Sequence, residues 1–97
     1  MSILLTDIQR GWLYTTESDQ ERLVLGWTQD GRVVYTMRGG NALNPFTGRQ
    51  TCSEERFANA CIRKQLLVDD DALSTIMRNT NAGDIVEHLD RPAKSGN

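Results

Sequence analysis

The dipeptide Asp30-Gly31 constrains the fold of this chain more than any other feature, because it separates two apolar runs, residues 23–27 and 33–37. Asp-Gly readily adopts the positive φ angles of a two-residue type I′ turn. The segment 22–38 therefore predicts an antiparallel β-hairpin, in which Trp27 pairs with Val34 and Gly26 with Tyr35.

Both faces of this predicted hairpin are apolar near the middle, since opposed residues share a face. One face carries Val24, Val33, Tyr35 and Met37, and the other carries Leu23, Leu25, Trp27 and Val34. A strand pair of this kind is covered on both sides or is curled into a small partial barrel. We therefore expect other elements to pack against each face.

Residues 11–16 predict a third strand, in which Trp12 and Tyr14 lie on one side and Leu13 and Thr15 on the other. The short polar linker 17–21 favours an antiparallel meander of this strand with the hairpin. Residues 1–9 leave two alternatives open, an edge strand through residues 3–6 or a single helical turn.

An amphipathic helix is expected over residues 53–67. Thr51 or Ser53 can cap its start, and the two glutamates that follow suit the first turn of a helix. The residues expected to face the sheet are Phe57, Ala58, Cys61, Ile62 and Leu66. Asp69 to Asp71 provide the cap of a second helix, and Asp84 begins a last short element with Ile85, Val86 and Leu89 turned inward.

These elements together predict an α+β fold with a three- or four-stranded antiparallel sheet, a meander with a type I′ hairpin. The amphipathic helix packs on this sheet, and the shorter C-terminal helical elements complete the cover. Residues 1–89 are expected to form a single α+β domain, and residues 90–97 a disordered C-terminal tail. Residues 38–50 predict a long loop, because glycine, proline and asparagine interrupt both periodicities.

Composition indicates a cytoplasmic protein. The chain of 97 residues contains no apolar run of the length that crosses a membrane and no apolar core of a signal peptide. Cys52 and Cys61 are expected to be free thiols, because nine residues of helix would hold them too far apart for a disulfide. Free thiols are typical of a reducing compartment.

The formal net charge of −2 conceals a basic centre, since residues 32–64 carry six Lys and Arg against two Glu. Four arginines of this centre are predicted to form one solvent-facing basic surface beside the long loop: Arg38, Arg49, Arg56 and Arg63. The alternative is an ordinary solvated helix face. Such a surface would bind an acidic protein partner or a phosphate backbone.

No pattern in the chain indicates catalysis, a metal or a cofactor. Two Cys and one His are too few for a structural zinc site. Cys52 could be activated at a helix start with His88 as its base, but a buried structural thiol is the simpler reading. Neither a Walker loop nor a dinucleotide fingerprint surrounds the loop glycines. We therefore expect no enzyme activity, and the sequence indicates no small-molecule substrate.

The remaining candidates for binding are three aromatic residues on the predicted strands, Trp12, Trp27 and Tyr35. They could stack on nucleic-acid bases beside the arginines, or they could belong to the core. The preferred interpretation is a small non-enzymatic binding or regulatory module that acts through protein-protein interaction, including self-association as a homodimer. The alternative is a nucleic-acid-binding module that uses the basic centre and these aromatic residues.

Overall fold

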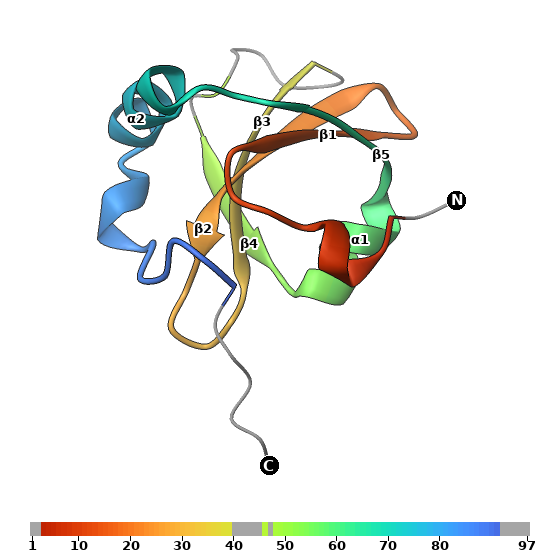
Figure 1. Ribbon diagram of the computed structural model, residues 1–97, viewed down its shortest axis with the longest axis horizontal. Helices are drawn as coiled ribbons and strands as arrows, with labels where there is room; N and C mark the ends of the chain where they lie inside the picture. The colour runs from red at the N-terminus through yellow and green to blue at the C-terminus, as the bar shows by residue number, and fades with distance from the viewer. Residues whose placement is uncertain (1–2, 40–45, 47, 92–97) are drawn as a thin grey trace.

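A computed structural model of the protein describes residues 3–39, 46 and 48–91. It contains a five-stranded antiparallel sheet with the strand order β4-β3-β2-β1-β5. The strands are β1 (Trp12–Thr16), β2 (Gln20–Trp27), β3 (Val33–Gly39), β4 (Arg49–Cys52) and β5 (Cys61–Leu67). The helices are α1 (Glu54–Ala60), α2 (Asp70–Asn79) and the 3-10 turns η1 (Leu5–Asp7) and η2 (Ala82–Asp84). Figure 1 shows the sheet curling, so that β1 and β5 cross β3 at a steep angle.

The predicted α+β fold and the predicted meander of β1, β2 and β3 are confirmed, with five strands in place of three or four. The type I′ turn is wrong. Thr28 N donates to Arg32 O at 2.9 Å and Gly31 N donates to Thr28 O at 3.0 Å, which makes a three-residue loop. Gly31 has a φ of +84°, whereas Asp30 is not among the residues with positive φ. This is the hairpin loop that ends in a left-handed glycine.

A β-bulge in β2 changes the predicted faces of the hairpin. Val24 pairs with Tyr35 and Gly26 pairs with Val34, so Leu25 and Gly26 together oppose one residue. The longer loop and the bulge each shift the pairing by one residue. Trp27 consequently lies with Val24 and Tyr35, on the face opposite to the one that the two-residue loop predicted.

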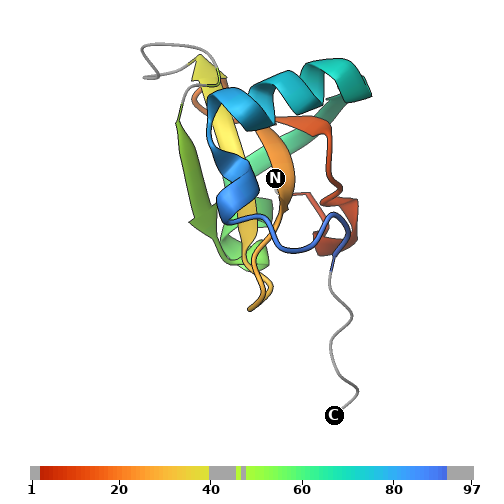
Figure 2. The ribbon, with the colours of Figure 1, turned by 90° about the vertical axis from the view of Figure 1, so that its left-hand side faces the viewer.

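The C-terminal segment fixes the backbone of Trp27 in this position. Trp27 N donates to His88 O at 2.9 Å, and Trp27 O accepts from Glu87 N and His88 N at 2.9 and 3.0 Å. Figure 2 shows this segment running from η2 across to η1. The bulge therefore places a large aromatic residue in the core and binds the end of the chain to the sheet.

Both faces of the sheet carry a hydrophobic core, as expected. On one face η1 and α1 cover a cluster that includes Tyr14, Val24, Trp27, Val33, Tyr35 and Phe57. On the other face α2 and η2 cover a cluster that includes Leu13, Leu23, Leu25, Val34 and Leu73. Tyr14 anchors the first cluster, because its hydroxyl donates to Asp7 O at 2.6 Å and its ring meets the Phe57 ring edge-on at 5.2 Å.

The predicted helix over residues 53–67 is wrong beyond Ala60. Its start is confirmed in part, since Ser53 caps α1 by accepting from Arg56 N at 3.2 Å. Residues 61–67 instead form β5, which pairs with β1. A helix in their place would leave one edge of β1 without hydrogen-bond partners, and the gain from pairing that edge outweighs the helix propensity of the segment.

Other segments differ from the sequence prediction in smaller ways. The long loop over residues 38–50 is shorter than expected, because β3 extends to Gly39 and β4 begins at Arg49; residues 40–45 and 47 lie outside the described residues. The N-terminal segment forms the single turn η1. The second helix is confirmed, and Asp69 caps it by accepting from Ala72 N at 2.8 Å. Leu89, expected to face inward, is 58% exposed.

The structure describes the first two residues of the expected tail, Asp90 and Arg91. Arg91 Nη2 donates to Glu54 Oε1 at 3.2 Å, and Arg91 Nε lies 2.6 Å from Glu54 Oε2, which accepts no aligned hydrogen bond. Glu54 is buried at the start of α1. The ion pair therefore joins the C-terminal segment to α1, and residues 92–97 lie outside the described residues.

Gly26 provides a test of the bulge. A Cβ on Gly26 would lie 2.5 Å from Val86 Cγ1 and 2.8 Å from His88 O, and the φ of this residue is +152°. We predict that Gly26→Ala lowers the free energy of unfolding by about 2 kcal/mol or more, measured by denaturant titration. Gly83→Ala is the control, because its added Cβ meets no atom within 4 Å. Equal stability of the two variants would contradict the packing of residues 86–88 on the bulge.

Candidate functional site

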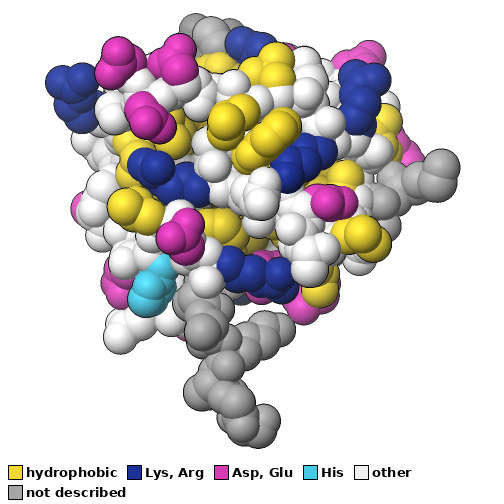
Figure 3. Space-filling view, in the orientation of Figure 1, with side chains coloured by type: hydrophobic (Ala, Val, Ile, Leu, Met, Phe, Trp, Pro, Cys, Tyr) yellow, Lys and Arg dark blue, Asp and Glu magenta, His cyan; other side chains and the backbone are white. Residues whose placement is uncertain are grey.

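The outer strand β5 exposes large apolar side chains. Ile62 is 40% exposed, Leu66 45% and Leu67 60%. Figure 3 shows hydrophobic side chains grouped over the part of the molecule that β5 crosses in Figure 1, with Lys and Arg side chains beside them. Exposed apolar groups concentrated on one element are typical of an interaction surface. We call the side chains of β5 that face solvent, Ile62, Arg63, Gln65, Leu66 and Leu67, the β5 surface.

Only one edge of β5 is paired within the described residues, the edge next to β1. Lys64 is held against this inner side, because its Nζ donates to Gln9 Oε1 at 2.5 Å and lies 4.3 Å from the centroid of the Trp12 ring. The pairing with β1 contains two register shifts, which place the bulged residues Ile62 and Gln65 on β5. Bulges and basic residues are common on edge strands, where they limit indiscriminate pairing.

The structure does not gather the four predicted arginines on one surface. Arg38 Nε lies 2.6 Å from Glu21 Oε1, and its guanidinium carbon lies 5.0 Å from the Phe46 ring centroid. Arg49 pairs with Asp84 across an open hollow. Arg56 lies on α1 and Arg63 lies on β5.

Two of these arginines affect the pKa of the same carboxylate, that of Glu21. Its pKa is lowered from the ordinary value, first by the hydrogen bond from Arg38 and to a smaller extent by Arg63. Arg38 and Arg63 therefore both act on this carboxylate, Arg38 through direct contact.

The three predicted aromatic residues are mostly core residues. Trp27 and Tyr35 are buried, and Trp12 is partly buried beneath Lys64. The Tyr35 ring meets the Phe57 ring at 5.3 Å. None of the three presents an open ring face on which a nucleic-acid base could stack without rearrangement.

A different arginine cluster lies around Cys52, and sequence reasoning missed it. The guanidinium carbon of Arg22 lies 4.9 Å from the Tyr35 ring centroid, and Arg32 Nη2 donates to Thr51 O at 3.5 Å. Burial raises the pKa of the Cys52 thiol, against the opposing effect of Arg22, Arg32 and Arg56. No carboxylate of the described residues lies within ion-pair distance of these three arginines. We call Arg22, Arg32 and Arg56 the arginine cluster.

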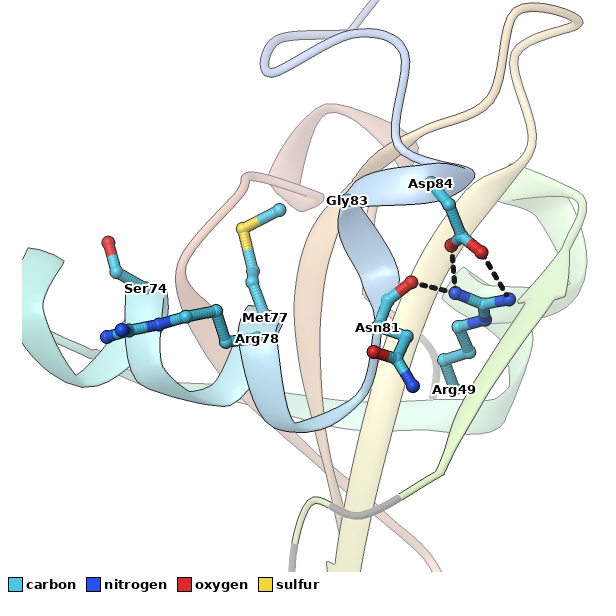
Figure 4. Close-up of a pocket in the computed structure, with 7 residues that line it drawn as sticks. All are labelled: Arg49, Ser74, Met77, Arg78, Asn81, Gly83 and Asp84. Carbon is cyan, nitrogen blue, oxygen red and sulfur yellow. Dashed lines mark hydrogen bonds and ion pairs between the residues drawn. The ribbon is translucent and has the colours of Figure 1, made fainter.

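An open hollow of about 650 Å³ lies between α2, η2 and β4 (Figure 4). Arg49 donates there to the Asp84 carboxylate and to Asn81 O, so its charge is already neutralised. Arg78 and Ser74 extend from α2 at the other end, away from this pair. The charged groups at the Arg49 end of this hollow therefore satisfy one another.

Both cysteines are free thiols, and both are buried. Burial raises the pKa of both cysteines, which removes the thiolate that a nucleophile needs. Within residues 3–39, 46 and 48–91, no three His, Cys, Asp or Glu side chains are placed to hold a metal ion. No helix among these residues is long and apolar enough to cross a membrane.

We predict that the folded protein loses stability at alkaline pH, because its thiols are buried. Burial raises the pKa of Cys61 to about 12, above the value of about 8.5 for an unfolded cysteine. Between these values the unfolded chain loses the proton and the folded chain keeps it, so rising pH favours unfolding. We expect the free energy of unfolding to fall by about 2 kcal/mol between pH 8 and pH 10.5, measured by urea titration.

Cys61→Ala is the control for this effect. The variant is less stable at both pH values because it leaves a cavity, but its alkaline loss should be smaller than that of the parent protein. An identical loss in the two proteins would assign the effect to other groups, such as Tyr14, whose pKa is also raised by burial.

The geometry thus supplies the β5 surface and the arginine cluster as the two exposed features that a partner could contact. Comparison of the chain with protein-family models, with curated proteins and with solved structures finds no match.

Proposed function

We propose that this protein is a non-enzymatic protein-interaction module that self-associates as a homodimer through the β5 surface. The observation that carries the proposal is the concentration of exposed Ile62, Leu66 and Leu67 on an outer strand. Among the described residues, most other large apolar side chains are packed into the two cores. Association would remove these three from water.

The sequence of β5 is suited to antiparallel pairing with a second copy. Ile62 and Leu66 lie two residues to either side of Lys64. A two-fold axis at Lys64 would place Ile62 of one copy opposite Leu66 of the other, twice, once the outer edge of β5 pairs regularly. Such pairing requires the bulges at Ile62 and Gln65 to straighten, because in the pairing with β1 they set Lys64 and Leu66 on opposite faces. The same register places Arg63 opposite Gln65, which is uncharged.

Lys64 is the unfavourable element of this register, because it would lie opposite its own copy. Its ammonium group is drawn toward Gln9 and Trp12 on the inner side of the strand, which moves it away from the axis. The two bulges in β5 also shorten the regular part of the edge. We therefore expect a weak dimer that forms reversibly with concentration.

Sedimentation velocity tests this dimer from about 10 µM to about 1 mM, where weak association becomes measurable. We expect the mass to rise from monomer toward dimer over this range. The double variant Ile62→Ser/Leu66→Ser should remain monomeric, and Leu89→Ser should behave like the parent, because Leu89 is equally exposed but lies outside β5.

Lys64→Gln tests the register itself. Removing the like charge at the axis should raise the association constant about twofold to fivefold. A parent protein that stays monomeric throughout would contradict the homodimer. Association that Lys64→Gln leaves unchanged would contradict the pairing about Lys64 while preserving β5 as the interface.

A second candidate function, nucleic-acid binding, rests on the arginine cluster. Arg22, which lies over the Tyr35 ring, Arg32 and Arg56 have no carboxylate partner among the described residues, and each lowers the pKa of the same Cys52 thiol. Phosphate groups are favoured ligands of such a cluster. The aromatic residues that would stack on bases are buried, so this binding would depend on the backbone charge and be insensitive to sequence.

The test is fluorescence anisotropy with a labelled poly-thymidine strand at several salt concentrations. If the cluster binds phosphate, the logarithm of affinity falls linearly with that of salt, and Arg56→Ala reduces the slope by about 0.7. Arg78→Ala on α2 is the control and should leave the slope unchanged. A salt-independent affinity, or equal effects of the two variants, would contradict nucleic-acid binding by this cluster.

A further inference from the structure

The strand β4 is the other outer strand of the sheet, and no strand lies beside its far edge within residues 3–39, 46 and 48–91. Its pairing with β3 is regular from Arg49 to Cys52 and contains no bulge, unlike the pairing of β5 with β1. A regular edge offers backbone donors and acceptors to an added strand. Many proteins bind extended peptides in this way.

The hydrogen bonds of the hairpin determine which backbone groups of β4 point outward. Arg32 O accepts from Thr28 N at 2.9 Å, so the backbone groups of Arg32 face β2. Backbone N–H and C=O groups alternate sides along a strand, so those of Val33 face β4 and bond its partner Cys52. By the same alternation, the N–H and C=O of Thr51 point away from the sheet.

An arginine side chain occupies the outward carbonyl of Thr51. Arg32 Nη2 donates to Thr51 O at 3.5 Å, which is long for a hydrogen bond. The N–H of an added peptide strand could take this place at the ordinary length of about 2.9 Å. Arg32 would then be released, and its guanidinium could pair with a carboxylate of the same peptide.

The arginine cluster lies on the face of the sheet to which alternate β4 side chains point. Gln50 is on this face, because its Oε1 accepts from Tyr35 Oη at 3.3 Å, and the guanidinium carbon of Arg22 lies 4.9 Å from the Tyr35 ring centroid. Burial raises the pKa of Cys52 and of Tyr35, and Arg22 and Arg56 oppose this effect at both. A carboxylate placed beside Gln50 or Cys52 would therefore be near positive charge.

The acids near the cluster leave it with an excess of positive charge. Asp30 accepts from Thr28 Oγ1, and Glu54 is paired with Arg91. Glu55 is exposed on α1 and makes no ion pair with the described residues. Three arginines therefore face at most two acids that have no cation of their own, which favours a negatively charged partner.

We propose that the outer edge of β4 binds an extended peptide that carries acidic residues at alternate positions. The peptide pairs antiparallel with β4, as the other strands of the sheet pair, and its central residue exchanges two backbone hydrogen bonds with Thr51. The two flanking carboxylates lie beside Gln50 and Cys52 and meet the arginine cluster. This site is independent of the proposed homodimer, because none of its residues belongs to β5.

The experiment titrates the ¹⁵N-labelled protein with the peptide Thr-Glu-Val-Glu-Thr, blocked at both ends, and follows the backbone amides by NMR. We expect a saturable downfield shift of the Thr51 resonance, with a Kd of about 1 mM or lower. The peptide Thr-Glu-Glu-Val-Thr has the same composition but sets its carboxylates on opposite faces, so it should bind about threefold more weakly. Methylation of the valine nitrogen removes the N–H that Thr51 O accepts, and should weaken binding about fivefold to tenfold.

Two protein variants test the same edge. Thr51→Pro removes the outward N–H without removing a hydrogen bond to β3, so it should fold and lose peptide binding. Arg56→Gln should weaken binding about twofold to fivefold, whereas Arg78→Gln, an exposed control on α2, should not. The absence of a saturable shift up to about 20 mM peptide overturns the proposal. Equal affinity for the two peptides, or for the methylated one, also overturns it and assigns the cluster to partners bound by charge alone, such as a phosphate backbone.

Discussion

The structure depends on one constraint, a β2-β3 ladder that is apolar on both faces. Val24 and Val33 on one face and Leu23 and Val34 on the other are all fully buried. Each face needs its own cover, so the chain places η1 and α1 on one side and α2 and η2 on the other. Among the described residues no further helix covers the outer strand β5. The exposed apolar groups of β5 are a consequence of covering the centre of the sheet twice.

The bulge at Gly26 connects this constraint to the rest of the molecule. By turning Trp27 toward η1 and α1, it adds the largest fully buried side chain to the core beneath these two elements. It also frees the Trp27 backbone to bind residues 87 and 88. The C-terminal segment is thereby held beside η1, where Arg91 meets Glu54. These distant parts of the chain therefore meet at Trp27.

Local signals in the sequence predicted the parts of the fold that local forces decide. The turn at Gly31, strand β1 and the Asp69 cap of α2 were all indicated by neighbouring residues. The strand β5 was not, because Arg63 to Leu67 are good helix formers and their pairing partner lies about fifty residues earlier. The face of Trp27 was missed for a related reason, since a one-residue bulge reverses a face and leaves only a glycine as its signal.

The candidate sites were predictable only as residue types. The arginines of the basic centre were predicted to share one surface, whereas Arg49 pairs with Asp84 of η2, and Arg56 and Arg63 lie on different elements, α1 and β5. The palindromic spacing of Ile62 and Leu66 about Lys64 has meaning only on a strand, because on a helix residues four apart lie on one face with the middle residue on the other. Because residues 61–67 form a strand and not a helix, side chains that were predicted to face the core lie on an edge strand, which could pair with a second copy of the chain. The functional hypothesis therefore depends on the pairing of β5 with β1 more than on any single side chain.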